Sequence, residues 1–134
     1  QGTRSLGKKY ATGTAKASGG TKNFDRLLGH MSPATMGLYW VEVSGLTFKP
    51  SKIIIYNTNS HYAGDRLITT IYLGDVAWQN ASDIVQIFDA PSTPQTRAIY
   101  FFKAQANSAY VTSSGFLLPY FVSYTDVIWE AYGD

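Results

Sequence analysis

Hydrophobic residues along this chain alternate with polar ones over short stretches, and no apolar pattern keeps the 3.6-residue period of an amphipathic helix. The clearest alternation lies in residues 125–132, where Val127, Trp129 and Ala131 fall on one side of an extended chain. Residues 52–56 form a short, nearly continuous β-branched run between turn formers, which predicts a buried strand. The pattern predicts strands at residues 10–16, 23–28, 38–43, 52–56, 66–73, 76–79, 84–88, 97–103, 115–122 and 125–132.

Eight to ten short strands at this spacing, without an internal repeat, predict an all-β fold built as an antiparallel β-sandwich or barrel. The length of 134 residues suits one domain, at residues 10–134. Residues 1–9 lack apolar periodicity and are expected to form a flexible basic arm, in which Gln1 and Gly2 are compatible with the remnant of a cleaved tag. A first residue other than Met predicts a fragment or a processed chain.

Composition supports the β prediction. The chain has ten Tyr, seven Phe and three Trp, and its only glutamates are Glu42 and Glu130, so it is poor in a preferred residue of surface helices. It has no cysteine, which excludes a disulfide framework and a thiolate metal site. No apolar run reaches membrane-spanning length, so we expect neither membrane insertion nor a secretory leader.

The net charge of +2 is unevenly distributed, because five basic residues precede the first acidic residue, Asp25. This basic N-terminal part of the chain is a candidate contact for an anionic partner. The competing interpretation is a solvated linker, since Gly, Ser and Thr separate its lysines. We expect no nucleic-acid partner, because the aromatic residues fall where a core needs them and acids soon follow the arm.

The sequence lacks catalytic and cofactor motifs. The two histidines, His30 and His61, stand in different predicted loops, and neither GxSxG nor a phosphate-binding glycine pattern is present. We therefore expect no enzyme activity, no cofactor and no metal site. A glycan-degrading activity would need a carboxylate pair in one groove, which the spacing of Glu42, Glu130 and the aspartates neither supports nor excludes.

Two predicted loops combine aromatic rings with hydrogen-bonding side chains. Sugar recognition uses such a combination, because a pyranose has an apolar C–H face and a ring of hydroxyls. The competing interpretation is a Trp78 that faces the core, beside ordinary polar loop residues. The predicted ligand-binding residues are Asn59, His61, Tyr62, Asp65, Trp78 and Asn80.

One segment, VSGLTFKPSKIIIY at residues 43–56, resembles a "GLxFKPSxIxV" segment of tail-associated proteins from phages of Gram-positive bacteria. ATGTA at 11–15 is similar to the entry strand of those proteins. GFLLP at 115–119 and VIWEAY at 127–132 resemble their closing strands, with Gly133 in place of a final acid. The segment 129–131 also resembles a strand of the H-type lectin sandwich.

The resemblance implies a β-sandwich of H-type-lectin or jelly-roll-like character in a phage tail fibre, tail tip or baseplate. It implies a homotrimer that adheres to host cell-surface glycan, a location in the virion, and assembly in the bacterial host cytoplasm. The alternative is a purely structural virion protein, such as a tail-tip, head-decoration or fibre-connecting domain, that contacts only other virion proteins. The loops depart from the lectin pattern, so no sugar ligand is carried over from it.

Overall fold

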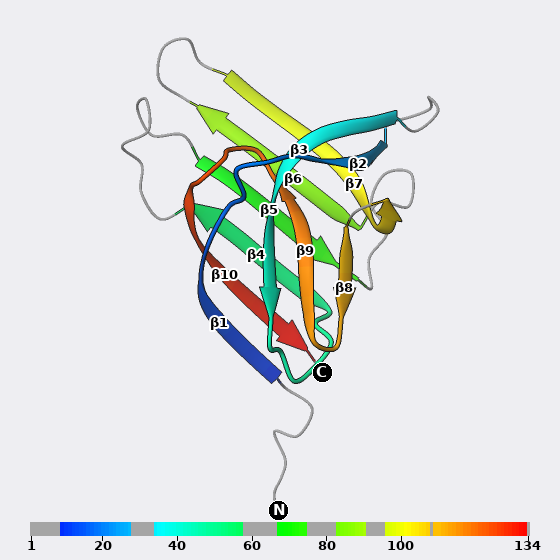
Figure 1. Cartoon of the computed structure of the whole chain (residues 1–134), viewed down its shortest axis with the longest axis vertical. Helices are drawn as coiled ribbons and strands as arrows, with labels where there is room; N and C mark the ends of the chain where they lie inside the picture. Colours follow the sequence, from blue (N-terminus) through cyan, green and yellow to red (C-terminus); the bar gives the residue numbers. More distant parts are fainter. Residues whose placement is uncertain are drawn as a thin grey trace, which may run out of the picture.

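The computed structural model describes residues 9–27, 34–57, 67–74, 83–90, 96–107 and 109–133, and these residues form ten β-strands (Figure 1). The strands are β1 Lys9–Lys16, β2 Lys22–Leu27, β3 Ala34–Ser44, β4 Lys52–Asn57, β5 Leu67–Leu73, β6 Ile84–Ala90, β7 Thr96–Asn107, β8 Tyr110–Thr112, β9 Gly115–Tyr120 and β10 Asp126–Gly133. The described part of the chain contains no apolar helix long enough to cross a membrane.

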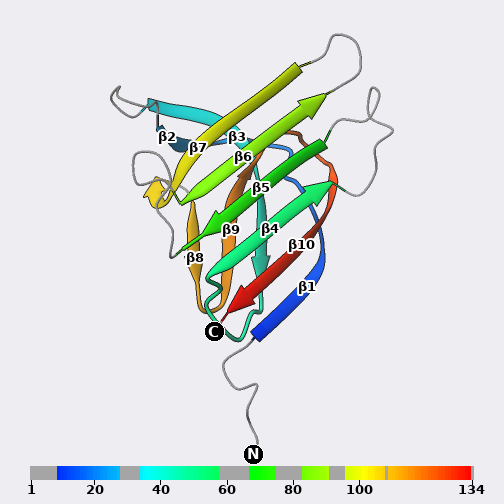
Figure 2. The same ribbon diagram turned by 180° about the vertical axis from the view of Figure 1, so that it is seen from behind.

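All strand pairs in these ranges are antiparallel, and their hydrogen-bonded order is β1-β10-β4-β5-β6-β7-β2-β3-β9-β8. The order folds over on itself into two facing layers, as Figures 1 and 2 show. One layer holds β1, β10 and the meander β4 to β7, and the other holds β3, β9 and β8. Strand β2 joins the layers, because it pairs with both β7 and β3.

The two layers enclose an apolar core. Residues from both layers point into this core, and they include Phe24, Phe102, Phe116 and Tyr120, which are fully buried. Two hydrogen bonds join β5 directly to β9: Thr70 Oγ1 donates to the Pro119 carbonyl at 2.7 Å, and the Tyr120 hydroxyl donates to the Ile68 carbonyl at 2.8 Å. Burial raises the pKa of the Tyr120 phenol above its ordinary value, so this donor stays protonated.

The edge of the sandwich beside β1 is closed by main-chain hydrogen bonds. Ala17 N donates to the Thr125 carbonyl and Ser18 N donates to the Trp40 carbonyl, both at 2.9 Å. Thr125 precedes β10 in one layer, whereas Trp40 belongs to β3 in the other. The segment that follows β1 therefore fastens the two layers together.

The structure confirms the predicted all-β class, with two layers compatible with a sandwich. It also confirms the faces predicted for 125–132, since Val127, Trp129 and Ala131 are buried and the residues between them are half-buried. Strand β8, with three residues, was not predicted from the sequence, and the predicted strand at 76–79 lies outside the described residues.

The predicted strand bounds were wrong at several ends. Strand β3 begins four residues before the predicted start, at Ala34, and β7 extends to Asn107 rather than ending at residue 103. Residues 89, 90 and 96, which lie outside the strands predicted at 84–88 and 97–103, belong to β6 and β7. Pairing with β2 extends β3 through Gly37 to Ala34, and the β6–β7 ladder continues to Ala90 and Thr96. These long-range ladders override local turn propensity.

The first residue of the first strand, β1, and the last residue of the last strand, β10, lie at the same end of the domain. Lys9, the first residue of β1, pairs with Gly133 at the end of β10, and at the far end of the same ladder Lys16 pairs with Asp126. The seven residue steps between these ends separate them by about 23 Å. The connections 17–21 and 121–125 therefore lie at the end of the domain opposite Lys9 and Gly133 (Figure 1).

Candidate interaction surface

The residues predicted from the sequence to bind a ligand all lie outside the described residues; they are Asn59, His61, Tyr62, Asp65, Trp78 and Asn80. The structure does place the strand ends that bound them. Asn57 and Leu67 stand at one end of β5, where Asn57 Oδ1 accepts a hydrogen bond from Ile68 N at 3.2 Å. Asp83 stands at the other end, where its carbonyl accepts from Leu73 N at 2.9 Å. The two predicted loops therefore start from opposite ends of β5, about 20 Å apart.

The side chains that could form a functional surface lie instead on the outer face of the layer that contains β1, β10, β4, β5 and β6. This face is turned toward the viewer in Figure 2. Register aligns its residues in rows across the strands. Glu130, Ile54, Ile71 and Val85 occupy one row, from β10 to β6. The next row holds Ile128, Tyr56, Thr69 and Ile87.

This outer face is apolar where an exposed antiparallel sheet is usually polar. Its apolar members, which we call the aliphatic face, are Ile54, Ile71, Leu73, Val85, Ile87 and Ile128. Ile54 stands between Ile53 and Ile55, which are fully buried in the core, so β4 presents isoleucine to both sides. The sequence predicted β4 to be a buried strand, and its run of isoleucines reflects apolar residues on two faces. A contiguous apolar face of this kind indicates an interaction surface.

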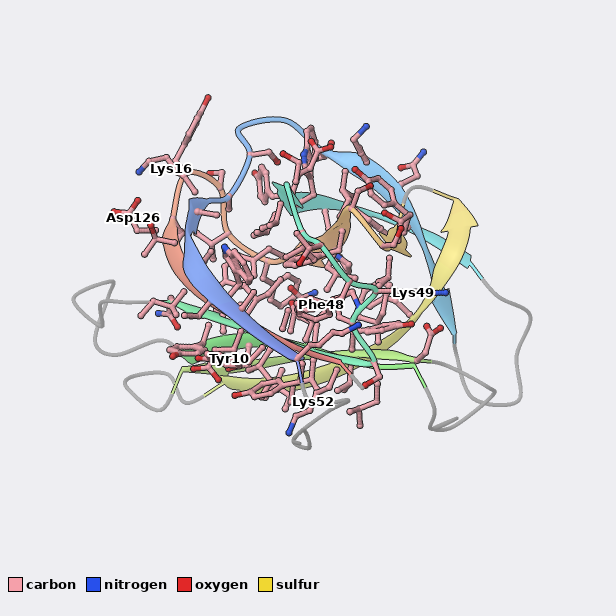
Figure 3. All side chains as sticks on the ribbon, turned by 90° about the horizontal axis from the view of Figure 1, so that it is seen from below. Tyr10, Lys16, Phe48, Lys49, Lys52 and Asp126 are labelled. Atoms are coloured by element: carbon pink, nitrogen blue, oxygen red, sulfur yellow. The ribbon has the colours of Figure 1, made fainter. Side chains whose placement is uncertain are left out.

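A carboxylate bound by two tyrosines borders the aliphatic face. Glu130 Oε2 accepts a hydrogen bond from the Tyr56 hydroxyl at 2.9 Å, and Glu130 Oε1 accepts one from the Tyr132 hydroxyl at 2.7 Å. Tyr10 packs on Tyr132 with ring centroids 5.0 Å apart, and Lys52 Nζ lies 5.3 Å from the centroid of the Tyr132 ring. We call these five residues the tyrosine–glutamate cluster. Figure 3 shows Lys52 on the outer side of the layer and Phe48 between the layers.

Hydrogen bonding sets the protonation of this cluster. The bonds from Tyr132 and then Tyr56 lower the pKa of the Glu130 carboxyl, so Glu130 is ionised. The hydrogen bond between Tyr132 and Glu130 also raises the pKa of Tyr132 to about 12, with smaller contributions from desolvation and from the Glu130 charge. The pKa of Tyr56 is raised for the same reasons. At neutral pH the cluster therefore contains an ionised carboxylate with two protonated phenols as its donors.

The sequence predicted that Val127, Trp129 and Ala131 share one side of the strand, which leaves Glu130 on the other side, as the structure has it. The tyrosine partners of Glu130 were not predicted. The alternation of β10 puts Glu130 and Tyr132 on one side, so that half of the cluster had a local signal. Tyr56 lies 74 residues away along the chain and meets Glu130 only through the β10–β4 ladder. No periodicity in the sequence carries that information.

The two glutamates do not form a carboxylate pair. Glu42 stands on the outer side of β3 in the second layer, where it accepts a hydrogen bond from the Tyr110 hydroxyl at 2.7 Å. That bond is also the main cause of the raised pKa of Tyr110. Glu130 stands on the outer side of the first layer, so the sandwich separates the two carboxylates. Within the described ranges, no group of three or more His, Cys, Asp or Glu side chains could hold a metal ion.

Comparison of the chain with protein families, with characterised proteins and with solved structures finds no match.

Proposed function

We propose that this chain is an adhesion domain of a phage tail, which assembles as a homotrimer and binds host cell-surface glycan without catalysing a reaction. One observation carries the assembly half of the proposal: Ile54, Ile71 and Val85 form a continuous apolar row on the outer sheet face, in which Ile54 and Ile71 are half-buried and Val85 is buried. The resemblance of residues 43–56 and 127–132 to phage tail proteins supports the tail location and the trimer.

A second copy of this chain can cover the outer face of this layer, which includes the aliphatic face. The five strands β1, β10, β4, β5 and β6 make a surface about 19 Å wide, and eight residues of strand make it about 23 Å long. This corresponds to about 440 Å² of flat area, before the relief of the side chains adds to it. A standard protein interface buries about 800 Å² of accessible surface on each partner. The flat area is smaller than this standard, so a stable contact also uses the relief of the side chains and the rim of the face.

Charge also favours self-association over a strongly charged partner. The tyrosine–glutamate cluster contributes one carboxylate, on Glu130, and one ammonium group, on Lys52. Lys16 and Asp126 at the edge of the layer form an ion pair of 2.7 Å with both side chains more than half exposed. Two copies of such a surface carry no large excess of one sign, so they can approach without repulsion.

The placement of the strand ends supports an adhesive role. Chain that precedes Lys9 or follows Gly133 leaves from one end of the domain, and the connections 17–21 and 121–125 stand at the other end. A domain attached through Lys9 and Gly133 would turn those connections away from its attachment. In a trimer, three such ends would face the host surface together and multiply a weak affinity.

Mass measurement in solution tests the assembly half. Multi-angle light scattering should give three times the chain mass of 14.8 kDa for the wild type. Ile71→Lys should give the mass of one chain, because an ammonium group in the middle of the aliphatic face cannot be buried unpaired. Ser44→Lys is the matched control, since Ser44 is exposed at the end of β3 in the other layer. A wild type that stays monomeric at every concentration would overturn self-association through this face.

Sedimentation with purified cell walls of Gram-positive bacteria tests the adhesion half. The wild type should sediment with walls from a susceptible host, and free wall polysaccharide should compete. A wild type that binds no wall preparation, yet is captured by purified phage tails, would favour the structural virion protein.

A further inference from the structure

Tyr124 has an unusual backbone and an unusual exposure. Its φ is +54°, in the left-handed region that glycine adopts freely, and it is the one non-glycine residue with positive φ in the described ranges. Its side chain is 69% exposed, more than that of any other large hydrophobic residue described. A strained backbone that carries an exposed ring suggests that the side chain itself is needed at this position.

Main-chain contacts fix Tyr124 against the connection that follows β1. Tyr124 N donates to the Ala17 carbonyl at 3.1 Å and to the Ser18 carbonyl at 3.3 Å. The Tyr124 ring lies against Gly19, where a Cβ atom would collide with the phenol. Gly19 therefore leaves space for the ring, and the ring has a defined place on the surface.

A second aromatic ring contacts the same connection. Trp40 N donates to Ser18 Oγ at 3.0 Å, and the half-buried Trp40 side chain approaches Gly20, whose Cβ would lie 3.9 Å from the end of the indole. Lys22 Nζ lies 4.8 Å from the centroid of the Trp40 ring. We call Trp40, Tyr124, Lys22 and the connection Ser18–Gly20 the aromatic patch.

The chemistry of this patch matches a pyranose. An aromatic ring binds the C–H face of a sugar through dispersion and its quadrupole, while an ammonium group donates to hydroxyl or acidic oxygens. Gly19 lets the Tyr124 ring pack on the main chain, and Gly20 places no side chain beside the Trp40 ring. The patch also stands at the end of the domain opposite Lys9 and Gly133, where an adhesive surface is expected.

We infer that the aromatic patch is the site at which this domain binds a pyranose of the host cell wall, with Tyr124 as the stacking ring and Lys22 as a hydrogen-bond donor. The inference rests on the proposed adhesion function but not on the trimer. Each site binds weakly, because one exposed ring and one flexible lysine bury little surface.

Binding to immobilised cell-wall polysaccharide from a Gram-positive host tests the inference. Tyr124→Gly removes the ring and suits the left-handed backbone, so the variant should fold normally. It should bind about tenfold more weakly than the wild type, as expected when one stacking contact is lost. Lys22→Ala should also weaken binding. Lys49→Ala is the matched control for Lys22→Ala, because Lys49 is an exposed lysine beside Gly133, at the end of the domain away from the patch, and it should bind like the wild type.

The outcomes separate the two proposals. If the wild type binds and Tyr124→Gly binds equally well, the aromatic patch is not the site, and the adhesion function stands. If Lys49→Ala loses as much binding as Lys22→Ala, the effect of Lys22 is one of overall charge, and Lys22 is not a donor in the site. If the wild type binds no host polysaccharide, both the adhesion function and the patch are overturned. Mass measured on each variant keeps an assembly defect from being mistaken for a binding defect.

Discussion

The carboxylate of Glu130 accepts a hydrogen bond of 2.7 Å from the hydroxyl of Tyr132, which stands two residues further along the same face of β10. Residues i and i+2 of a strand share a face, so this contact follows directly from strand geometry. Tyr56 completes the arrangement from the neighbouring strand, with a hydrogen bond of 2.9 Å to the other carboxylate oxygen. The hydrogen bonds from Tyr132 and Tyr56 therefore link the protonation of the Glu130 carboxyl to the stability of the outer face.

Stability should depend on pH through Glu130. Its pKa is lower in the folded state than in the unfolded chain, so its contribution is complete above the unfolded value and disappears as pH falls through the folded value. Glu130→Gln should therefore lower the urea midpoint at about pH 7 and leave it unchanged at about pH 2. Both proteins should carry Ile71→Lys, so that assembly does not contribute. A difference in midpoint that is equal at both pH values would contradict this assignment.

Neighbouring isoleucines of β4 should behave differently. Ile53 is fully buried between the layers, so Ile53→Ala should cost about 2–5 kcal/mol of unfolding free energy. Ile54 is half-buried on the aliphatic face, so Ile54→Ala should cost the isolated chain less and should weaken assembly instead. Unfolding at low concentration and light scattering at high concentration separate the two effects. Equal losses of chain stability, with assembly intact in both, would remove Ile54 from the interface.

The buried amide of Gln86 should lower the unfolding free energy of the domain. Gln86 is fully buried, and among the residues that the structure describes neither its Nε2 nor its Oε1 has a hydrogen-bond partner. Gln86→Met keeps the length of the side chain and removes the unpaired polar atoms, so it should raise the unfolding free energy by about 1–3 kcal/mol. Thr70→Val in the adjacent strand is the opposite control, because it deletes the 2.7 Å bond to Pro119 and should destabilise. A destabilised Gln86→Met variant would show that the amide contributes to the native state.

Two glycines provide a paired test of the packing between β3 and β9. A Cβ at Gly115 would collide with the Val43 carbonyl, so Gly115→Ala should clearly destabilise the domain. Gly37 is exposed, and a Cβ there would meet only Asn23 Oδ1 at 3.8 Å. Gly37→Ala should be neutral or stabilise by about 0.5–1 kcal/mol, since alanine loses less entropy than glycine in a strand. Thermal unfolding measures both, and similar midpoints for the two variants would contradict the collision.

Much of the fold was predictable because strand formation has a local signal. Alternation in β10 and the isoleucine run of β4 predicted both strands, and in β10 it also predicted which residues face the core. Strand β8 escaped prediction because three residues are too few for an alternation to be recognised. The early start of β3 escaped it because Gly37 and its neighbours become a strand through pairing with β2.

The candidate surfaces had a weaker signal. Sequence reasoning concentrated on loops at 57–65 and 78–80, since polar and aromatic residues gather there. In the described structure, the candidate surfaces are formed by residues of strands and short connections. From the sequence, Ile54 suggested a buried strand, Ile71 and Trp40 suggested strands, and Tyr124 stood between two predicted strands.

The amino-acid sequence by itself determined that this chain forms strands and which residues along most strands share a face, because both depend on a period of two residues. Only the tertiary structure decided which faces meet and which stay outside. Tyr56 reaches Glu130 through a ladder between strands 74 residues apart, and Tyr124 reaches Gly19 by packing across the closed edge of the sandwich. The pairing of distant strands depends on the total burial of the folded domain, which no local pattern records.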